Sequence, residues 1–290
     1  IRDGRLSRGL GDVYKRQLQG PPKSTPPLHD AEWPSQVREG PRAPYRFHVN
    51  KRQASAPTVI AVHGWTSGVA HARNRTQALT EAGFHVILLE SLGHGSSTYD
   101  GPWTAHCVLE CLEDLLDGLF SGALGMSPTR LLLHGHSLGA YVILRLLTGR
   151  HGDRVEALLL ESPMTRYSPI FEEILLDLGW PRRLPGFRAR LIRRMMKEWN
   201  AMHPNVSITD MADVDVPRWG KPKVPTFVMQ ADPDHRLGPV HLDALRSCMP
   251  HDLLDVWRST TLRHSGTSLH LERDAAMMAW LEAKAFIPHC

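Results

Sequence analysis

Long apolar runs are missing from the sequence, and this excludes one broad class of protein. Apolar residues make up 42% of the chain, yet runs such as 86–89 and 157–160 span only a few residues. A helix that crosses a bilayer needs about 20 consecutive apolar residues, so we expect no transmembrane segment. No apolar stretch follows the basic N-terminal part either, and a secretory signal needs one. We therefore expect a cytoplasmic location.

Cysteine is also scarce, and its residues are spread along the chain. The four cysteines are Cys107, Cys111, Cys248 and Cys290. A zinc site needs cysteine or histidine ligands in pairs, and Cys107 and Cys111 lie far from a second pair. We expect thiols in a reducing compartment, and we expect no metal and no cofactor.

An excess of charge of one sign is absent from most of the chain. The formal net charge is +4, and residues 1–27 alone account for it with six Lys or Arg and two Asp. The remainder is balanced, so charge gives no argument for a nucleic-acid partner. The pattern carries no signal for the oligomeric state.

The first 44 residues lack the apolar periodicity of a folded segment. Residues 1–17 are rich in Gly and Arg and resemble translated adapter or vector sequence. Residues 18–44 are rich in proline. We expect residues 1–44 to be disordered or non-native, and we expect the folded domain to span residues 45–290.

From residue 45 onward, short apolar segments alternate with helical patterns. The expected strands cover residues 45–50, 58–63, 84–90, 130–134, 155–161, 226–230 and 253–258. The expected helices cover residues 71–82, 104–120, 138–147, 238–248 and 273–286. This alternation predicts an α/β fold with a mostly parallel central sheet and helices on both faces. In such sheets, active residues gather at the carboxyl ends of the strands.

Residues 165–216 interrupt the alternation and contain no convincing buried strand. Apolar residues recur there at helical spacing, as at Phe187, Leu191, Met195 and Trp199. The basic residues of the same stretch are Arg182, Arg183, Arg188, Arg190, Arg193, Arg194 and Lys197. We expect an amphipathic basic helix within a helical cap over the carboxyl edge of the sheet. Its basic face either makes weak contact with anionic lipid or an acidic substrate, or is a solvated face of a packed helix.

The run Gly135-His136-Ser137-Leu138-Gly139 follows an expected strand and begins an expected helix. A Gly-x-Ser-x-Gly motif in this context forms a tight turn that exposes the serine hydroxyl. The N-terminus of the following helix directs N–H groups toward a developing oxyanion. We predict that Ser137 is the nucleophile of a serine hydrolase.

Two further motifs follow expected strands, His63-Gly64-Trp65 and Gly93-His94-Gly95. With the Ser137 motif, they make residues 45–285 resemble the α/β-hydrolase superfamily, and in particular its serine esterases and lipases. Dehalogenases and epoxide hydrolases of this fold resemble the chain less, because they carry Asp where it has Ser137.

The resemblance implies the position of an oxyanion hole. Its two donors are the N–H of Leu138, directly after the nucleophile, and the N–H of Trp65. The Trp65 ring would line the acyl pocket, or alternatively pack in the core. We also assign His63, Gly64 and His136 to the substrate-binding site.

A general base is expected between the last strand and the last helix, because the acid and then the base follow the serine in this fold. His264 satisfies both conditions. His270 is the alternative, but it lies so close to the final helix that we expect it to face solvent or to pack locally.

The acid that orients the histidine has three candidates. Asp234 and Asp232 both follow the strand at 226–230. The usual Asp-x-x-Val form, followed by proline, resembles the segment from Asp234 to Pro239. Asp232 is next to a proline and suits a turn. Glu161, after an earlier strand, is the third candidate. We favour Asp234.

These residues predict a hydrolase that cleaves carboxylic esters of small to medium acyl groups through a Ser137-His264-Asp234 triad and an acyl-enzyme. The partner is then a small-molecule acyl substrate. A peptidase, amidase or thioesterase would use the same triad, and the sequence does not separate these activities. A non-catalytic binding protein of this fold is a third class, and the presence of all triad members argues against it.

Overall fold

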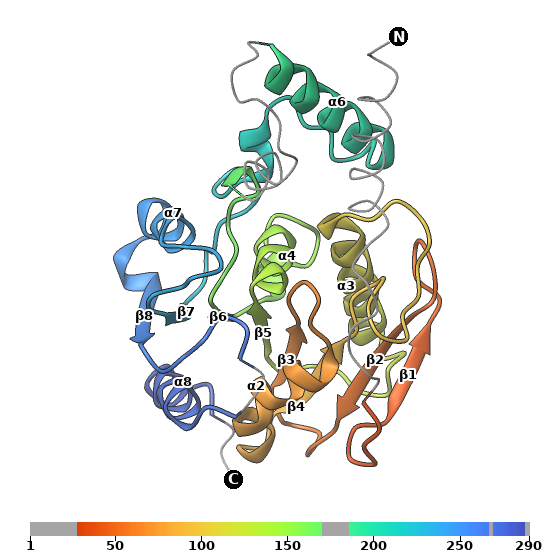
Figure 1. Ribbon diagram of the computed structural model, residues 1–290. Helices are drawn as coiled ribbons and strands as arrows, with labels where there is room; N and C mark the ends of the chain where they lie inside the picture. The colour runs from red at the N-terminus through yellow and green to blue at the C-terminus, as the bar shows by residue number, and fades with distance from the viewer. Residues whose placement is uncertain (1–27, 170–185, 267–268, 288–290) are drawn as a thin grey trace.

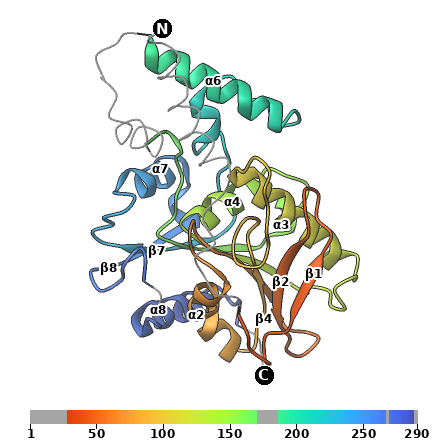
Figure 2. The same ribbon diagram turned by 45° about the vertical axis from the view of Figure 1, so that its right-hand side comes forward.

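The computed structural model describes residues 28–169, 186–266 and 269–287 (Figures 1 and 2). Its centre is an eight-stranded sheet in the order β1-β2-β4-β3-β5-β6-β7-β8. The strands are β1 (Ser35–Arg38), β2 (Tyr45–Asn50), β3 (Thr58–Val62), β4 (His85–Leu89), β5 (Leu131–His136), β6 (Ala157–Glu161), β7 (Thr226–Ala231) and β8 (Leu254–Ser259). The pairs β1–β2 and β2–β4 are antiparallel, and the other neighbours are parallel.

Helices cover both faces of this sheet, which confirms the predicted α/β architecture. They are α2 (Val69–Glu81), α3 (Ala105–Phe120), α4 (Leu138–Leu146), α6 (Phe187–Met202), α7 (Val240–Cys248) and α8 (Leu271–Ala283). Short 3-10 turns occur as η1 (Gly152–Arg154), η2 (Met211–Val214) and η3 (His251–Leu253). Within the described ranges, no helix has the length and apolar character that crossing a membrane requires.

The core is divided into two halves by the sheet. Successive strand residues point to opposite faces, so Ile60 packs with residues of α3 and α4 while Val59 packs with residues of α2 and α8. Burial on both faces explains why the central strands appear in the sequence as continuous apolar runs rather than as alternating patterns.

The sheet begins earlier in the chain than predicted. Trp33 is buried, and β1 pairs with β2 through register partners such as Val37 and Arg46. The expected boundary at residue 45 is therefore too late for residues 28–44. β1 has four residues of alternating partial exposure at the edge of the sheet, so backbone pairing rather than an apolar run defines it. Residues 1–27 lie outside the described part of the chain.

The predicted basic helix is present as α6, which lies apart from the sheet beyond α3 and α4 (Figures 1 and 2). Its C-terminal half is attached to the following segment. The Trp199 indole donates to the Val206 carbonyl at 3.1 Å, and Asn200 exchanges two hydrogen bonds with Ile208. Residues 170–185 of the expected cap lie outside the described residues.

Candidate active site

Ser137 lies in the turn between β5 and α4. Its backbone has φ 53° and ψ −116°, a region that non-glycine residues rarely occupy and that costs about 1–3 kcal/mol. The Ser137 N–H donates to the Glu161 carbonyl at 3.1 Å, and the Ser137 carbonyl accepts from the Met164 N–H at 3.2 Å. The end of β6 and the loop after it therefore hold this turn in its strained conformation.

The two glycines of the motif allow α4 to pack closely behind the turn. A Cβ atom on Gly139 would lie 2.0 Å from the Val62 carbonyl oxygen, and one on Gly135 would lie 2.6 Å from the Ala140 Cα. Both contacts are with backbone atoms, which cannot move aside cheaply. Small residues at these positions are therefore a packing requirement of the turn.

The structure brings Ser137, His264 and Asp234 together in a line. The His264 Nε2 atom lies 3.0 Å from the Ser137 Oγ, and the Nδ1 atom lies 2.9 Å from the Asp234 Oδ2. His264 comes from the loop after β8, and Asp234 from the loop after β7. The imidazole is therefore hydrogen-bonded to the serine hydroxyl on one side and to a carboxylate on the other.

Asp234 is a buried carboxylate that accepts several hydrogen bonds from the protein. Its Oδ1 accepts from the N–H groups of Arg236 and Leu237 at 2.9 and 3.0 Å. Burial opposes ionisation of Asp234, but the hydrogen bond to His264 and these N–H groups outweigh it and lower the pKa of the carboxyl below its ordinary value. The carboxylate beside the histidine is thus charged at neutral pH.

The alternative residues lie elsewhere. Asp232 is half-exposed and pairs with Arg258 at 3.1 Å. Glu161 is buried against two arginines rather than against His264. His270 is the N-cap of α8 and accepts the Arg273 N–H at 3.1 Å through Nδ1, so it packs locally as expected.

The loop that carries Trp65 lies directly against the nucleophile. A Cβ atom on Gly64 would lie 3.1 Å from the Ser137 Cβ. The N–H of Leu138 is at the start of α4, where no helical acceptor exists. Within residues 28–169, 186–266 and 269–287, the N–H groups of Trp65 and Leu138 donate no hydrogen bond to the protein. They are available to an external oxygen, and their use as an oxyanion hole remains a prediction.

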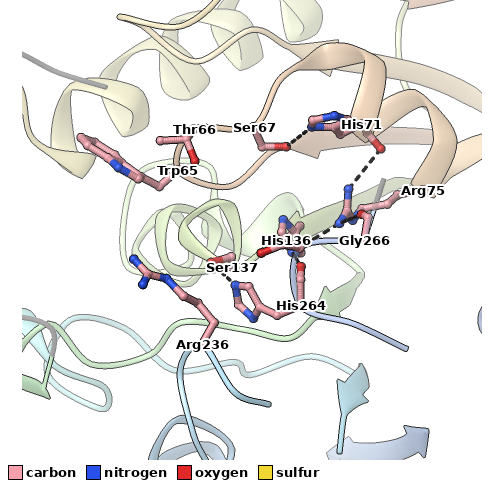
Figure 3. A pocket seen from close by; sticks show the side chains of 11 residues that line it. Trp65, Thr66, Ser67, His71, Arg75, His136, Ser137, Arg236, His264 and Gly266 are labelled. Carbon is pink, nitrogen blue, oxygen red and sulfur yellow. Dashed lines mark hydrogen bonds between the residues drawn. The ribbon is translucent and has the colours of Figure 1, made fainter. Parts of the chain in front are cut away.

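A cavity of about 340 Å³ opens in front of Ser137 and His264 (Figure 3). The Trp65 ring lines one side, packed against the Trp103 ring at 4.6 Å between centroids. His136 also lines the cavity. The other lining residues are Thr66, Ser67, His71, Arg75, Arg236, Ser265 and Gly266. Apart from Trp65 and Gly266, the lining residues have polar side chains.

His63 is placed beneath the loop rather than in the cavity. It is buried, its Nε2 accepts the Ser91 N–H at 3.1 Å, and its Nδ1 donates to the Gly64 carbonyl at 2.9 Å. Burial lowers the pKa of His63 to about 3, so the ring is neutral. Of the three residues assigned to substrate contact, the described cavity lining contains His136 and neither His63 nor Gly64.

Several lining residues were not predicted. Thr66, Ser67, Ser265 and Gly266 directly follow predicted site residues in the chain, and this adjacency could have identified them. His71 and Arg75 carry no such signal, because they lie within α2, which has no motif of its own.

One group of side chains has the composition of a metal site. Ligand atoms of His106, Glu110 and His203 lie within 4.8 Å of one another. Arg42, however, bonds both carboxylate oxygens of Glu110 and lies 3.0 Å from the His203 Nδ1. A guanidinium thus occupies the acceptors that a cation would need, and the group joins α3 to the end of α6 as an ion-pair network.

The cysteines of the described chain are free thiols, as predicted. Cys107 and Cys111 are buried on α3, and burial raises the pKa of both. Cys248 is partly buried. Cys290 lies outside the described residues.

A mostly parallel sheet with helices on both faces, a serine at a strand–helix turn and a histidine against its hydroxyl together define the class of α/β hydrolases. Residues 59–280 match the model of the Alpha/beta hydrolase family. The chain belongs to this family, which is a family of hydrolases. No curated protein sequence matches the chain.

Solved structures agree with this fold. The Pyrococcus furiosus esterase Pf2001 is 16% identical with a TM-score of 0.66, over 91% of this chain and 98% of that one. XC6422 from Xanthomonas campestris, described as an a/b serine hydrolase without lid, is 17% identical with a TM-score of 0.59, over 91% and 99%. Mouse alpha/beta hydrolase domain-containing protein 10 is 13% identical with a TM-score of 0.61, over 87% and 98%. At these identities the likeness concerns the fold.

Proposed function

We propose that this protein is a serine hydrolase that cleaves carboxylic esters of small to medium acyl groups, with Ser137, His264 and Asp234 as its catalytic triad. One observation carries the proposal. The His264 ring lies between the Ser137 hydroxyl at 3.0 Å and the Asp234 carboxylate at 2.9 Å, which is hydrogen-bonding distance on both sides.

The chemistry follows from this line of contacts. His264 Nε2 takes the Ser137 proton as Oγ attacks the ester carbonyl carbon, and the imidazolium then gives that proton to the departing alcohol. Water attacks the resulting acyl-enzyme with His264 again as base, which releases the acid and restores Ser137. Asp234 accepts the Nδ1–H bond, selects the tautomer with a free Nε2 lone pair, and stabilises the imidazolium.

The tetrahedral intermediate carries a negative oxygen that needs donors. The N–H groups of Trp65 and Leu138 flank Ser137 and lack protein acceptors within the described residues, so we assign them to this oxygen. Loss of one such donor costs about 10²–10³-fold in rate in related chemistry.

The size and polarity of the cavity support small substrates. Its volume of about 340 Å³ is near the lower end of the range of about 300–1,000 Å³ for ligand pockets. Thr66, Ser67 and Ser265, which carry hydroxyl groups, line it, whereas a long acyl chain needs an extended apolar wall. The Pyrococcus relative is named as an esterase, which agrees with an ester substrate.

A substrate panel tests the proposal. Purified protein is assayed with p-nitrophenyl esters of two to twelve acyl carbons, and in parallel with an acetyl anilide and an acetyl thioester. We expect the largest kcat/KM on the shortest esters and none above background for Ser137→Ala. Faster turnover of the anilide or the thioester would contradict the ester assignment. Turnover retained in Ser137→Ala would contradict the nucleophile.

We also propose that residues 165–216 form a cap over the site and that α6, within it, makes weak electrostatic contact with anionic lipid. A cytoplasmic location of the protein is a further part of the proposal. The cap assignment is supported by the position of α6 outside the sheet-and-helix body (Figure 1). The lipid contact is supported by four exposed cations on one side of α6, namely Arg190, Arg193, Arg194 and Lys197.

A further inference from the structure

The loop that carries His264 is held by two buried side chains from other parts of the fold. The ring bonds to Ser137 and Asp234 fix its nitrogens but not the backbone of the loop. His136 Nε2 lies 2.7 Å from the His264 carbonyl oxygen, and Arg75 Nη2 lies 2.7 Å from the Gly266 carbonyl oxygen (Figure 3). These two contacts join the loop after β8 to β5 and to α2.

Arg75 links three separate segments with one guanidinium. Its Nε donates to the Glu161 carboxylate at 2.8 Å, its Nη1 donates to the His71 carbonyl at 3.3 Å, and its Nη2 donates to Gly266. The side chain is 4% exposed. The donors of a guanidinium are rigidly arranged in a plane, so fixing the carboxylate contact also fixes the direction in which Nη2 points.

Glu161 gives Arg75 a charged and immobile partner. Its carboxylate is buried at the end of β6 and also accepts from Arg273 at 3.3 Å. Burial alone would favour the neutral acid, but the charges of Arg75 and Arg273 outweigh it and lower the pKa of Glu161 to about 2. The Glu161 carboxylate is therefore ionised throughout the neutral range.

His136 is a neutral donor with a defined tautomer. Burial holds the pKa of its ring well below the ordinary value. Because a carbonyl oxygen can only accept, Nε2 carries the hydrogen and donates to His264. The opposite nitrogen, Nδ1, is packed against Gly64, where a Cβ atom would come within 2.9 Å. The ring thus has one orientation, directed at the loop.

We propose that Arg75 and His136 are positioning residues that hold the backbone of His264–Gly266, so that the His264 ring stays between Ser137 and Asp234. The inference rests on the proposed function and adds to it the parts of the fold that align the base. A displacement of about 1 Å in such a group costs about 10²-fold in rate. Loosening the loop should therefore lower kcat much more than it raises KM.

Arg75→Lys and Arg273→Lys form a matched pair of variants. Both keep a positive charge beside Glu161, but a lysine at 75 cannot reach Glu161 and Gly266 together. The side-chain hydrogen bonds of Arg273 in the described part of the chain go to Glu161, Asp274 and the Asn74 carbonyl rather than to residues 264–266. We expect Arg75→Lys to lower kcat on p-nitrophenyl acetate by about 10–100-fold with KM within about threefold. We expect Arg273→Lys to keep kcat within about threefold at a comparable loss of Tm. Equal kcat losses in the two variants, or none in Arg75→Lys, would overturn the inference.

A second pair tests the other contact and keeps the inference testable if Arg75→Lys fails to fold. In His136→Gln the amide nitrogen takes the place of Nε2 and still donates, whereas in His136→Asn it falls short of the His264 carbonyl. We expect His136→Asn to lose about tenfold more in kcat than His136→Gln. Equal kcat values for His136→Asn and His136→Gln would overturn the positioning role of His136.

The wild-type protein separates this inference from the proposed function. A wild type that hydrolyses none of the esters overturns the proposed function and this inference with it. If the wild type is active and both Arg75→Lys and His136→Asn hydrolyse the ester at the wild-type rate, the inference alone is overturned.

Discussion

Ser137 holds a backbone conformation that serine rarely adopts, with φ at 53°. The strain is compensated by the hydrogen bond to the Glu161 carbonyl and by the close packing of Gly135 and Gly139. The result is a hydroxyl directed at the cavity and at His264 before any substrate binds. Such preorganisation is what an acyl-transfer site requires.

The two aspartates after β7 give a prediction at a single position. Asp234→Asn leaves the shape of the site intact but favours the wrong imidazole tautomer, so we expect kcat to fall by about 10⁴-fold. Asp232→Asn removes an exposed ion pair with Arg258, and we expect kcat within about twofold of wild type. Steady-state kinetics on p-nitrophenyl acetate measures both. A large loss in Asp232→Asn with little in Asp234→Asn would reverse our assignment of the acid.

The residues that could be predicted from the sequence are those whose chain neighbours define them. Ser137 is indicated by the glycines of its motif, and His264 by its place between the last strand and the last helix. Asp234 is favoured over Asp232 because the segment up to Pro239 resembles the family form. Arg75 could not be predicted, because the residues it bonds, Glu161 and Gly266, lie 86 and 191 positions away in the chain. Contacts of this kind depend on how the elements pack, so no local pattern in the sequence predicts them.

The central strands and the edge strand β1 differ in how clearly the sequence predicts them. The central strands are mostly apolar because both faces are covered, and all of them were predicted within a few residues. β1 was missed, since its four residues alternate between exposed and partly buried and it is defined by backbone pairing with β2. A short strand with as little burial as β1 is therefore not predicted by patterns based on burial.

α6 carries its cations on the side away from its packed residues. Met196 and Trp199 pack against the core, while Arg190, Arg193 and Lys197 are exposed. A basic residue near an anionic bilayer contributes about 1 kcal/mol, and the effect is screened by salt. The expected lipid contact is therefore weak and electrostatic.

Vesicle sedimentation tests this contact. We expect binding to vesicles rich in phosphatidylserine at low salt, none to phosphatidylcholine vesicles, and loss of binding near 0.5 M salt, where screening is within about 4–5 Å. The double variant Arg193→Gln/Lys197→Gln should weaken binding by about tenfold or more. Lys221→Gln/Lys223→Gln removes the same charge from exposed residues elsewhere and is the control. Equal weakening in both variants would show that net charge, not α6, is responsible.

The molecule as a whole is joined at Glu161, where α2, β6 and α8 meet. Arg75 comes from α2 and Arg273 from α8, and both bond its carboxylate. Breaking a buried pair of this kind by removing one partner costs about 3–5 kcal/mol. The pair that aligns the loop of His264 is thus also part of the junction that joins α2, β6 and α8.

The pH dependence of stability should reflect this carboxylate. The pKa of Glu161 is lowered from 4.5 to about 2 in the folded protein. Its charge therefore stabilises the fold above about pH 4.5, and this contribution, on the order of 3 kcal/mol, is lost as the pH falls toward 2. We expect Glu161→Gln to be less stable than wild type at pH 7, with a difference that shrinks between pH 4.5 and 2. Denaturant unfolding at several pH values measures it, and a constant difference would contradict the ionised pair.

The central claim is that the turn after β5 holds an activated serine. Labelling with a fluorophosphonate, followed by peptide mass mapping of the adduct, tests it most directly. We predict one adduct, on Ser137, formed rapidly in the wild type and at least about 10³-fold more slowly in His264→Ala. A folded wild-type protein without an adduct on Ser137, or labelling that His264→Ala leaves unchanged, would contradict the account.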